Sequence, residues 1–176
     1  MKTFGWCWSY AAVVVAGFAA LYILTRPDWL ISDGESWILE ASLGDPTRTW
    51  YGFPSYFLQI PLTSVISGVL HWLGAPVSVA GVFLSVSLAG TLCAIVFVGL
   101  IGENVLRTRD AAWLAAILFG VSLNPWTQWN GELSGLAVGF LSAGLFFALR
   151  GQLVAPALLW GLSVLSHVDF VLAAPA

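Results

Sequence analysis

The chain has 176 residues, of which 59% are apolar, 14% are aromatic and only 9% are charged. A soluble domain usually carries about 25% charged residues, so this composition, with a mean hydropathy of +0.90, favours lipid as the solvent. It excludes a soluble globular domain, a disordered tail and a nucleic-acid-binding protein, which would need a basic patch that this sequence lacks. Cys7 and Cys93 lie inside apolar runs, which favours buried or lipid-facing thiols over a disulfide or a metal site.

Apolar runs long enough to cross the roughly 30 Å hydrocarbon core define the candidate membrane spans. The first run lies between Lys2 and Arg26 without a small-residue cleavage site, so it predicts an uncleaved anchor rather than a signal peptide. We predict an all-α, polytopic membrane helix bundle that forms one domain over residues 1–176. The predicted spans are residues 9–25, 77–101, 111–124, 133–149 and 153–170. The span at 111–124 is short, so we expect it to extend through Trp126 or to cross a thinned bilayer.

Residues 54–73 form a further apolar run, but Pro, Gly, His and other polar residues interrupt it. Pro61 lacks a backbone N–H in the middle of the run, and backbone exposed to lipid must satisfy its own hydrogen bonds. We therefore predict a broken helix that lies at the membrane surface, or dips into it, without crossing.

The basic residues distinguish two topologies. In the five-span topology with a cytoplasmic N-terminus, four basic residues lie inside and two outside, which the positive-inside rule favours. The inside set is Lys2, Arg107, Arg109 and Arg150, and the outside set is Arg26 and Arg48. A six-span alternative with an external N-terminus also places five basic residues in the cytoplasm, and it requires residues 54–73 to be a true span. In the preferred topology the loop of residues 26–76, the turn 125–132 and the region of His167 and Asp169 share the non-cytoplasmic face.

The first outer loop, residues 26–76, carries a dense group of charges between Arg26 and Arg48. Ser32 followed by Glu35 has the spacing of a capping box, which predicts a helix that begins there and ends near Gly44. Its apolar residues recur on one face, so we expect an amphipathic juxtamembrane helix on the outer surface. Asp33 lies in the first turn of this helix, where a carboxylate could face a cavity between spans. Glu35 is equally well explained as the capping partner.

The order of these parts resembles the N-terminal portion of the C-type glycosyltransferases (GT-C fold), which include the protein O-mannosyltransferases and the bacterial aminoarabinose transferases. Asp33, with Trp37 four positions later, is similar to the Asp-Glu motif of the aminoarabinose-transferase branch, although Gly34 replaces its Glu. Residues 51–56 and the pair 73–74 resemble the two boundaries of a juxtamembrane helix. The segment from Asn124 to Glu132 resembles the second outer loop, and residues 161–167 resemble a Gly-rich span that ends in Lys or Arg, with His167 at that position.

The resemblance implies an inverting transfer of a sugar from a polyprenyl-phosphate-linked donor to an acceptor on the non-cytoplasmic face. Asp33 would be the general base and Glu132 the second acid at the catalytic site. The implied substrate-binding residues are Glu35, Arg48, His167 and Asp169. Some members use a divalent cation, so Mg²⁺ or Mn²⁺ held by Asp33 and Glu132 is an option. The implied location is a prokaryotic plasma membrane, with the lipid-linked donor, membrane lipid and a subunit that completes the bundle as partners.

Family members usually have more spans than this sequence, so we expect a fragment, a chain that needs a partner, or a remnant without activity. Two alternatives to the enzyme stay open: a lipid transporter and a non-catalytic membrane subunit or scaffold. The predicted spans lack Asp, Glu, Lys and Arg in their interiors, which argues against ion-coupled transport but not against a lipid flippase. Gly135 and Gly139 form a Gly-x-x-x-Gly pattern that allows close helix packing in any membrane bundle.

Overall fold

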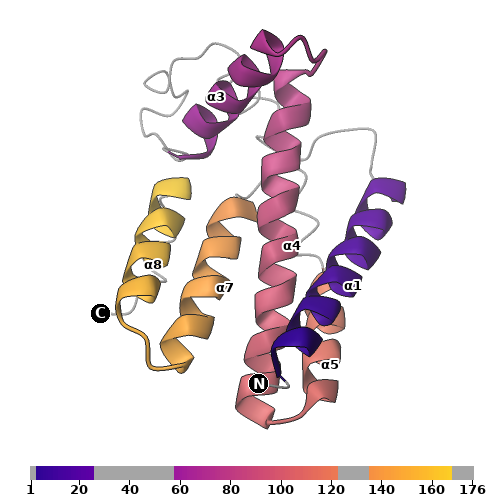
Figure 1. The fold of residues 1–176 in the computed structure, drawn as a ribbon, viewed down its shortest axis with the longest axis vertical. Coiled ribbons are helices and arrows are strands. Elements are labelled where there is room, and N and C mark those ends of the chain that lie inside the picture. The colour runs from indigo at the N-terminus through magenta and orange to yellow at the C-terminus, as the bar shows by residue number, and fades with distance from the viewer. Residues whose placement is uncertain (1–2, 26–57, 123–134, 168–176) are drawn as a thin grey trace.

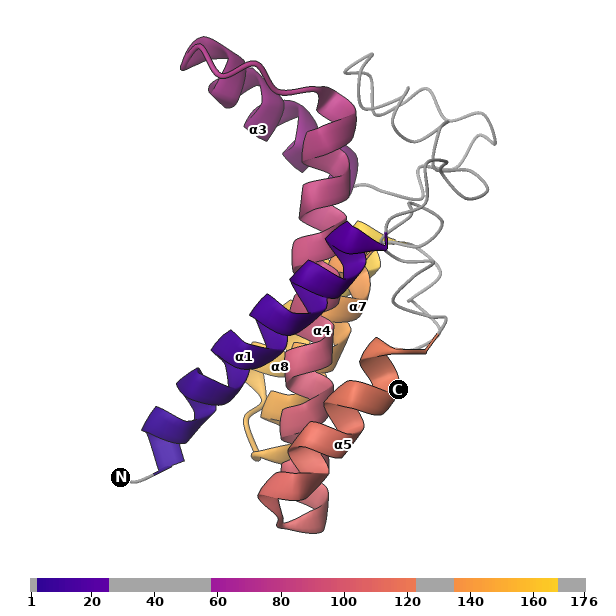
Figure 2. The same cartoon turned by 90° about the vertical axis from the view of Figure 1, so that its right-hand side faces the viewer.

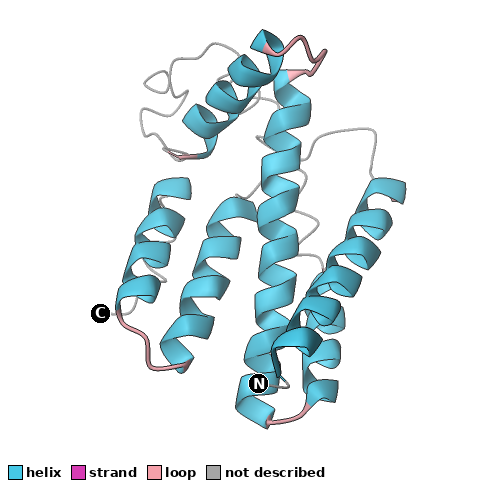
Figure 3. Cartoon of the chain, in the orientation of Figure 1, coloured by secondary structure: helices cyan, strands magenta, loops and turns pink. Residues whose placement is uncertain are grey.

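The computed structural model describes residues 3–25, 58–122 and 135–167, and within these ranges the regular structure is entirely helical (Figure 3). The helices are α1 (Thr3–Leu24), α3 (Gln59–Trp72), α4 (Val79–Leu106), α5 (Arg109–Gly120), α7 (Gly135–Leu149) and α8 (Val154–Ser166). The prediction of an all-α fold is confirmed for the described part of the chain. The helix predicted from Ser32 to Gly44 lies outside the described residues.

Helix α4 is the axis of the structure, because α1, α3, α5 and α7 all pack against it and α8 packs against α7 (Figure 1). Two short turns, at residues 107–108 and 150–153, lie together at one end of α4, which we call the turn end (Figure 1). The first residues of α1 point to this same end. At the opposite end, which we call the α3 end, α3 leaves the bundle direction and lies across the start of α4 (Figure 2). The five remaining helices alternate in direction between these ends.

Two buried tyrosines join α1 to α5 beside α4. The Tyr22 hydroxyl donates a hydrogen bond of 2.6 Å to the carbonyl oxygen of Gly120, and the Tyr10 hydroxyl donates a longer one of 3.4 Å to Ala112. Both rings are almost completely buried. Gly120 is the last residue of α5, where a carbonyl has no partner within the helix and in an apolar environment needs such a donor. The two bonds together tie α5 to α1 at both of its ends. Around them the core continues through Ile95 of α4 to Phe146 of α7.

Glycine allows α4 and α7 to approach closely. A Cβ atom added to Gly90 would overlap the backbone of Gly135 and Leu136, and one added to Gly139 would lie only 2.6 Å from the Gly90 carbonyl oxygen. The backbone N–H of Gly135 donates a hydrogen bond to Ser87 Oγ at 3.2 Å. The close packing that the Gly-x-x-x-Gly pattern allows is therefore present, and its partner surface is on α4.

Helix α4 is long enough and apolar enough to cross a membrane, and within the described ranges it is the one helix that meets both conditions. Its 28 residues correspond to about 42 Å at 1.5 Å per residue, more than the hydrocarbon thickness. The apolar segments Ser9–Leu24, Gly135–Leu149 and Val154–Ser166 are shorter. These features support an association of the chain with a membrane.

Several helix boundaries differ from the predicted spans. Helix α4 continues past residue 101 to Leu106 and stops because Arg107 adopts a left-handed backbone conformation with φ 60°. Helix α5 begins at Arg109, where the Thr108 side chain caps it, and it ends at Gly120 rather than continuing through Trp126. Helix α8 ends at Ser166 because His167 is extended, with φ −158° and ψ 120°. The apolar runs therefore located these helices, while local backbone conformation set their ends.

The prediction of a broken helix at residues 54–73 was wrong for the described part, because α3 is continuous from Gln59 to Trp72. Pro61 is the third residue of α3, where a backbone N–H has no partner within the helix in any case. The prediction treated Pro61 as the middle of a helix over the whole apolar run, but α3 begins at Gln59. At 14 residues α3 is about 21 Å long, and it differs from the other helices in lying across the start of α4 instead of along the bundle (Figure 2).

Candidate functional site

His167 is the one predicted site residue that the structure describes. Its side chain is only 5% exposed, and its backbone N–H donates a hydrogen bond of 3.0 Å to the Ser163 carbonyl at the end of α8. The other predicted site residues lie outside the described residues: Asp33, Glu35, Arg48, Glu132 and Asp169. The expected convergence of Asp33 and Glu132 on one cavity therefore stays a prediction.

Two hydrogen bonds place His167 at the α3 end of the bundle. The Ser163 hydroxyl donates to the Ala137 carbonyl at 2.8 Å, which joins the last turn of α8 to the first turn of α7. The backbone N–H of Leu58, directly before α3, donates to the Leu165 carbonyl at 2.7 Å. Three elements that are distant in sequence thus meet here: the start of α3, the start of α7 and the end of α8.

Helix α3 turns its polar side inward and its apolar side outward. Gln59, Thr63 and Ser67 follow one another at a spacing of four residues and are at most 9% exposed. On the opposite side, Val65 is 64% exposed and Trp72 is 84% exposed. A helix on a protein in water does the reverse and buries its apolar face. The arrangement of α3 is the one expected where lipid covers the outer face.

Two hydroxyls on this inward face lack hydrogen-bond partners in the described structure. These are Thr63 Oγ1 and Ser67 Oγ. Leaving a buried polar group unsatisfied costs about 1–3 kcal/mol, so two on one face form an energetically unfavourable surface unless something else satisfies them. The polar spacing of residues 59, 63 and 67 was visible in the sequence, where it was counted only as an interruption of an apolar run.

The described part of the α3 end carries no formal charge. Helices α1, α3, α7 and α8 contain no Asp, Glu, Lys or Arg, and in α4 the only such residue is Glu103, close to the turn end. Arg107, Arg109 and Arg150 also lie at the turn end, where the Arg150 guanidinium is 4.3 Å from the centre of the Phe146 ring. No group of three His, Cys, Asp or Glu residues able to hold a metal occurs in the described ranges.

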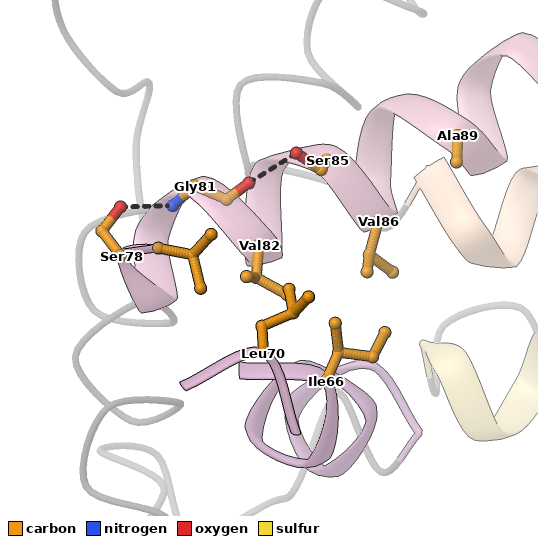
Figure 4. Close-up of a pocket in the computed structure, with 9 residues that line it drawn as sticks. Ile66, Leu70, Ser78, Gly81, Val82, Ser85, Val86 and Ala89 are labelled. Carbon is orange, nitrogen blue, oxygen red and sulfur yellow. Dashed lines mark hydrogen bonds between the residues drawn. The ribbon is translucent and has the colours of Figure 1, made fainter. Parts of the chain in front are cut away.

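An apolar cavity of about 480 Å³ lies between α3 and the first half of α4 (Figure 4). Ile66 and Leu70 of α3 face Val82 and Val86 of α4 across it (Figure 4). The hydroxyls of Ser78, which caps α4, and of Ser85 within α4 also line the cavity, but Gly81 satisfies both. Its N–H donates to Ser78 Oγ at 3.0 Å, and its carbonyl accepts from Ser85 Oγ at 2.7 Å. The cavity is therefore apolar, in contrast to the adjacent inward face of α3.

Comparison with known proteins adds no relative. The chain matches none of the family models, curated proteins or solved structures with which it was compared. Any function for it consequently rests on its own residues and on the arrangement of the helices that carry them.

Proposed function

We propose that the chain is a multi-pass membrane glycosyltransferase of the GT-C type, or the N-terminal portion of one. It transfers a sugar from a polyprenyl-phosphate-linked donor to an acceptor on the non-cytoplasmic face, with Asp33 as the general base. The observation that carries the proposal is the position of His167, buried where α3 begins, α7 begins and α8 ends. The predicted acids Glu132 and Asp169 are three residues before α7 and two residues after His167 in the sequence.

The direction of the helices supports the topology that this function needs. Helices α1, α4, α5, α7 and α8 alternate between the two ends, and both short turns lie at the turn end (Figure 1). Arg107 belongs to one of these turns and Arg150 to the other. The positive-inside rule assigns that end, and with it the N-terminus, to the cytoplasm. The α3 end then faces the non-cytoplasmic side of a prokaryotic plasma membrane. Residues 25–58 and 121–134 connect helices whose described ends point away from the turn end.

The proposed chemistry is a displacement at the anomeric carbon of the sugar. The carboxylate of Asp33 accepts the proton of the acceptor hydroxyl as its oxygen bonds to that carbon, and the bond from the carbon to the phosphate oxygen breaks. The polyprenyl phosphate leaves with the electron pair, so positive charge nearby stabilises it, and Arg48 is the proposed source. A divalent cation, in an enzyme that uses one, would be held by Asp33 and Glu132 and would supply further positive charge.

Replacement of Asp33 by Asn tests the proposal in the intact protein in its own membrane. Positioned general bases contribute about 10²–10⁴-fold to rate, so we expect Asp33→Asn to lower transfer by at least about 100-fold. Release of polyprenyl phosphate from lipid-linked hexose and pentose donors measures the reaction. Asp110→Asn, at the turn end, is the matched control and should retain activity. Full activity of Asp33→Asn would remove the catalytic assignment, and absence of transfer by the unaltered protein would favour a non-catalytic subunit.

A further inference from the structure

The hydroxyls of Thr63 and Ser67 differ from the other hydroxyls on these helices. Serines and threonines in helices can bond to the carbonyl four residues earlier, and Ser64, Ser85, Thr91 and Ser166 do so here. On α3 itself, the Ser64 hydroxyl donates to the Ile60 carbonyl at 3.1 Å. On α8, the Ser166 hydroxyl donates to the Leu162 carbonyl at 2.7 Å. Thr63 Oγ1 and Ser67 Oγ make no such bond in the described structure, although both are buried.

The two hydroxyls are also on one face of one helix. They are four residues apart, so they lie one turn above the other, and the amide of Gln59 is a further turn towards the junction with α8. All three side chains are at least nine-tenths buried. Two unsatisfied hydroxyls on the same inward stripe are more than the chance loss of a single hydrogen bond would produce. A surface kept in this state is suited to a molecule that supplies the missing donors and acceptors.

The chemistry of the stripe defines what can satisfy it. A hydroxyl both donates and accepts, and an amide does the same, so the stripe complements groups that are themselves neutral donors and acceptors. Phosphate or carboxylate would require Lys, Arg or several backbone N–H groups, and the described helices carry no Lys or Arg near α3. The basic side chain of α3 is His71, which is exposed rather than buried with Thr63 and Ser67. The hydroxyls of a sugar ring have the matching chemistry.

We propose that the inward face of α3 binds the neutral, hydroxylated part of a ligand through Thr63 and Ser67, with Gln59 beside them. The assignment of that ligand as a sugar rests on the proposed function. The apolar cavity on the adjacent side of α3 would then lie next to the ligand without contributing polar contacts. Thr63 and Ser67 are positioned to determine which hydroxyl pattern the site accepts.

Binding of methyl glucoside, methyl galactoside and methyl mannoside to the full chain in lipid nanodiscs tests the proposal, measured by saturation-transfer NMR. We expect at least one glycoside to bind, and the double variant Thr63→Val, Ser67→Ala to weaken that binding at least tenfold. Ser64→Ala, which removes a hydroxyl that the helix already satisfies, should leave the affinity unchanged. Inorganic phosphate, followed by ³¹P line width, should show no interaction that depends on Thr63 or Ser67.

Two results would overturn the proposal: no glycoside binds to the unaltered chain, or the double variant binds as well as the unaltered chain. The double variant removes two buried hydroxyls without partners, so its thermal midpoint should be equal to or above that of the unaltered chain. A lower midpoint would mean that the protein itself satisfies these hydroxyls, and it too would overturn the proposal. Asp33→Asn should still bind the glycoside. The two proposals can therefore fail separately. If the double variant alone loses glycoside binding and Asp33→Asn still transfers sugar, the catalytic assignment of Asp33 is refuted and the binding site on α3 is supported.

Discussion

The backbone N–H of Gly135 donates to Ser87 Oγ across 3.2 Å, which brings the first residue of α7 directly against α4. A side chain at Gly135 would overlap the Ser87 carbonyl, and one at Gly90 would overlap the backbone of α7. Because backbone atoms cannot move aside as a flexible side chain can, these glycines hold α4 and α7 at a distance that no larger residue permits.

Gly90→Ala should therefore separate the two helices. Overpacking of this kind costs about 1–3 kcal/mol, and we expect a loss of that size in the free energy of unfolding, measured by SDS titration in mixed micelles. Gly161→Ala is the matched control, because a Cβ there meets no atom within 4 Å. Since alanine favours helix over glycine, Gly161→Ala should stabilise the protein by up to about 1 kcal/mol. Equal effects of the two substitutions would contradict the packing argument.

Tyr22→Phe should destabilise the contact between α1 and α5. It removes the 2.6 Å hydrogen bond to the Gly120 carbonyl and leaves that acceptor buried. Hydrogen bonds in membrane proteins contribute about 0.6–1.7 kcal/mol, which sets the expected loss in the free energy of unfolding. Tyr10→Phe removes a longer bond of 3.4 Å and should cost less. An equal or larger loss for Tyr10→Phe would show that the ring positions, rather than the hydroxyls, join these helices.

The position of Pro61 in the first turn of α3 predicts unequal effects of proline along this helix. Pro61→Ala should change the free energy of unfolding by less than about 1 kcal/mol, because no helical hydrogen bond is gained or lost in that turn. Val65→Pro should lower the free energy of unfolding by about 3 kcal/mol or more, because it removes a hydrogen bond from the interior of the helix. Val65 is on the exposed side of α3, so the loss reports on the helix rather than on side-chain packing. Tolerance of Val65→Pro would mean that α3 is not a continuous helix.

The proposed topology predicts the side from which single cysteines react with a membrane-impermeant maleimide. In a background with Cys7→Ser and Cys93→Ser, cysteines at Thr108 and Gln152 should be labelled from the cytoplasmic side. A cysteine at Asp45 should be labelled from the other side. Labelling of Asp45 and Thr108 from the same side would support the six-span alternative, in which both loops face the cytoplasm.

The apolar runs were sufficient to locate the described helices, since each of these helices overlaps one of the runs. They were not sufficient for the helix ends. Where α4 stops depends on the backbone conformation of Arg107, and where α3 starts decides whether Pro61 interrupts a helix or opens one. Five of the predicted site residues lie outside the described ranges, so the sequence remains the basis for them.

The amino-acid sequence by itself indicated association with a membrane, predicted that the regular structure is helical, and showed that glycines at 135 and 139 would permit close packing. It could not determine which helix those glycines meet, or that Gln59, Thr63 and Ser67 would share one buried stripe on α3. Composition and periodicity describe one helix at a time. Which faces meet, and which polar groups are left without partners, depends on how the helices are packed together in three dimensions.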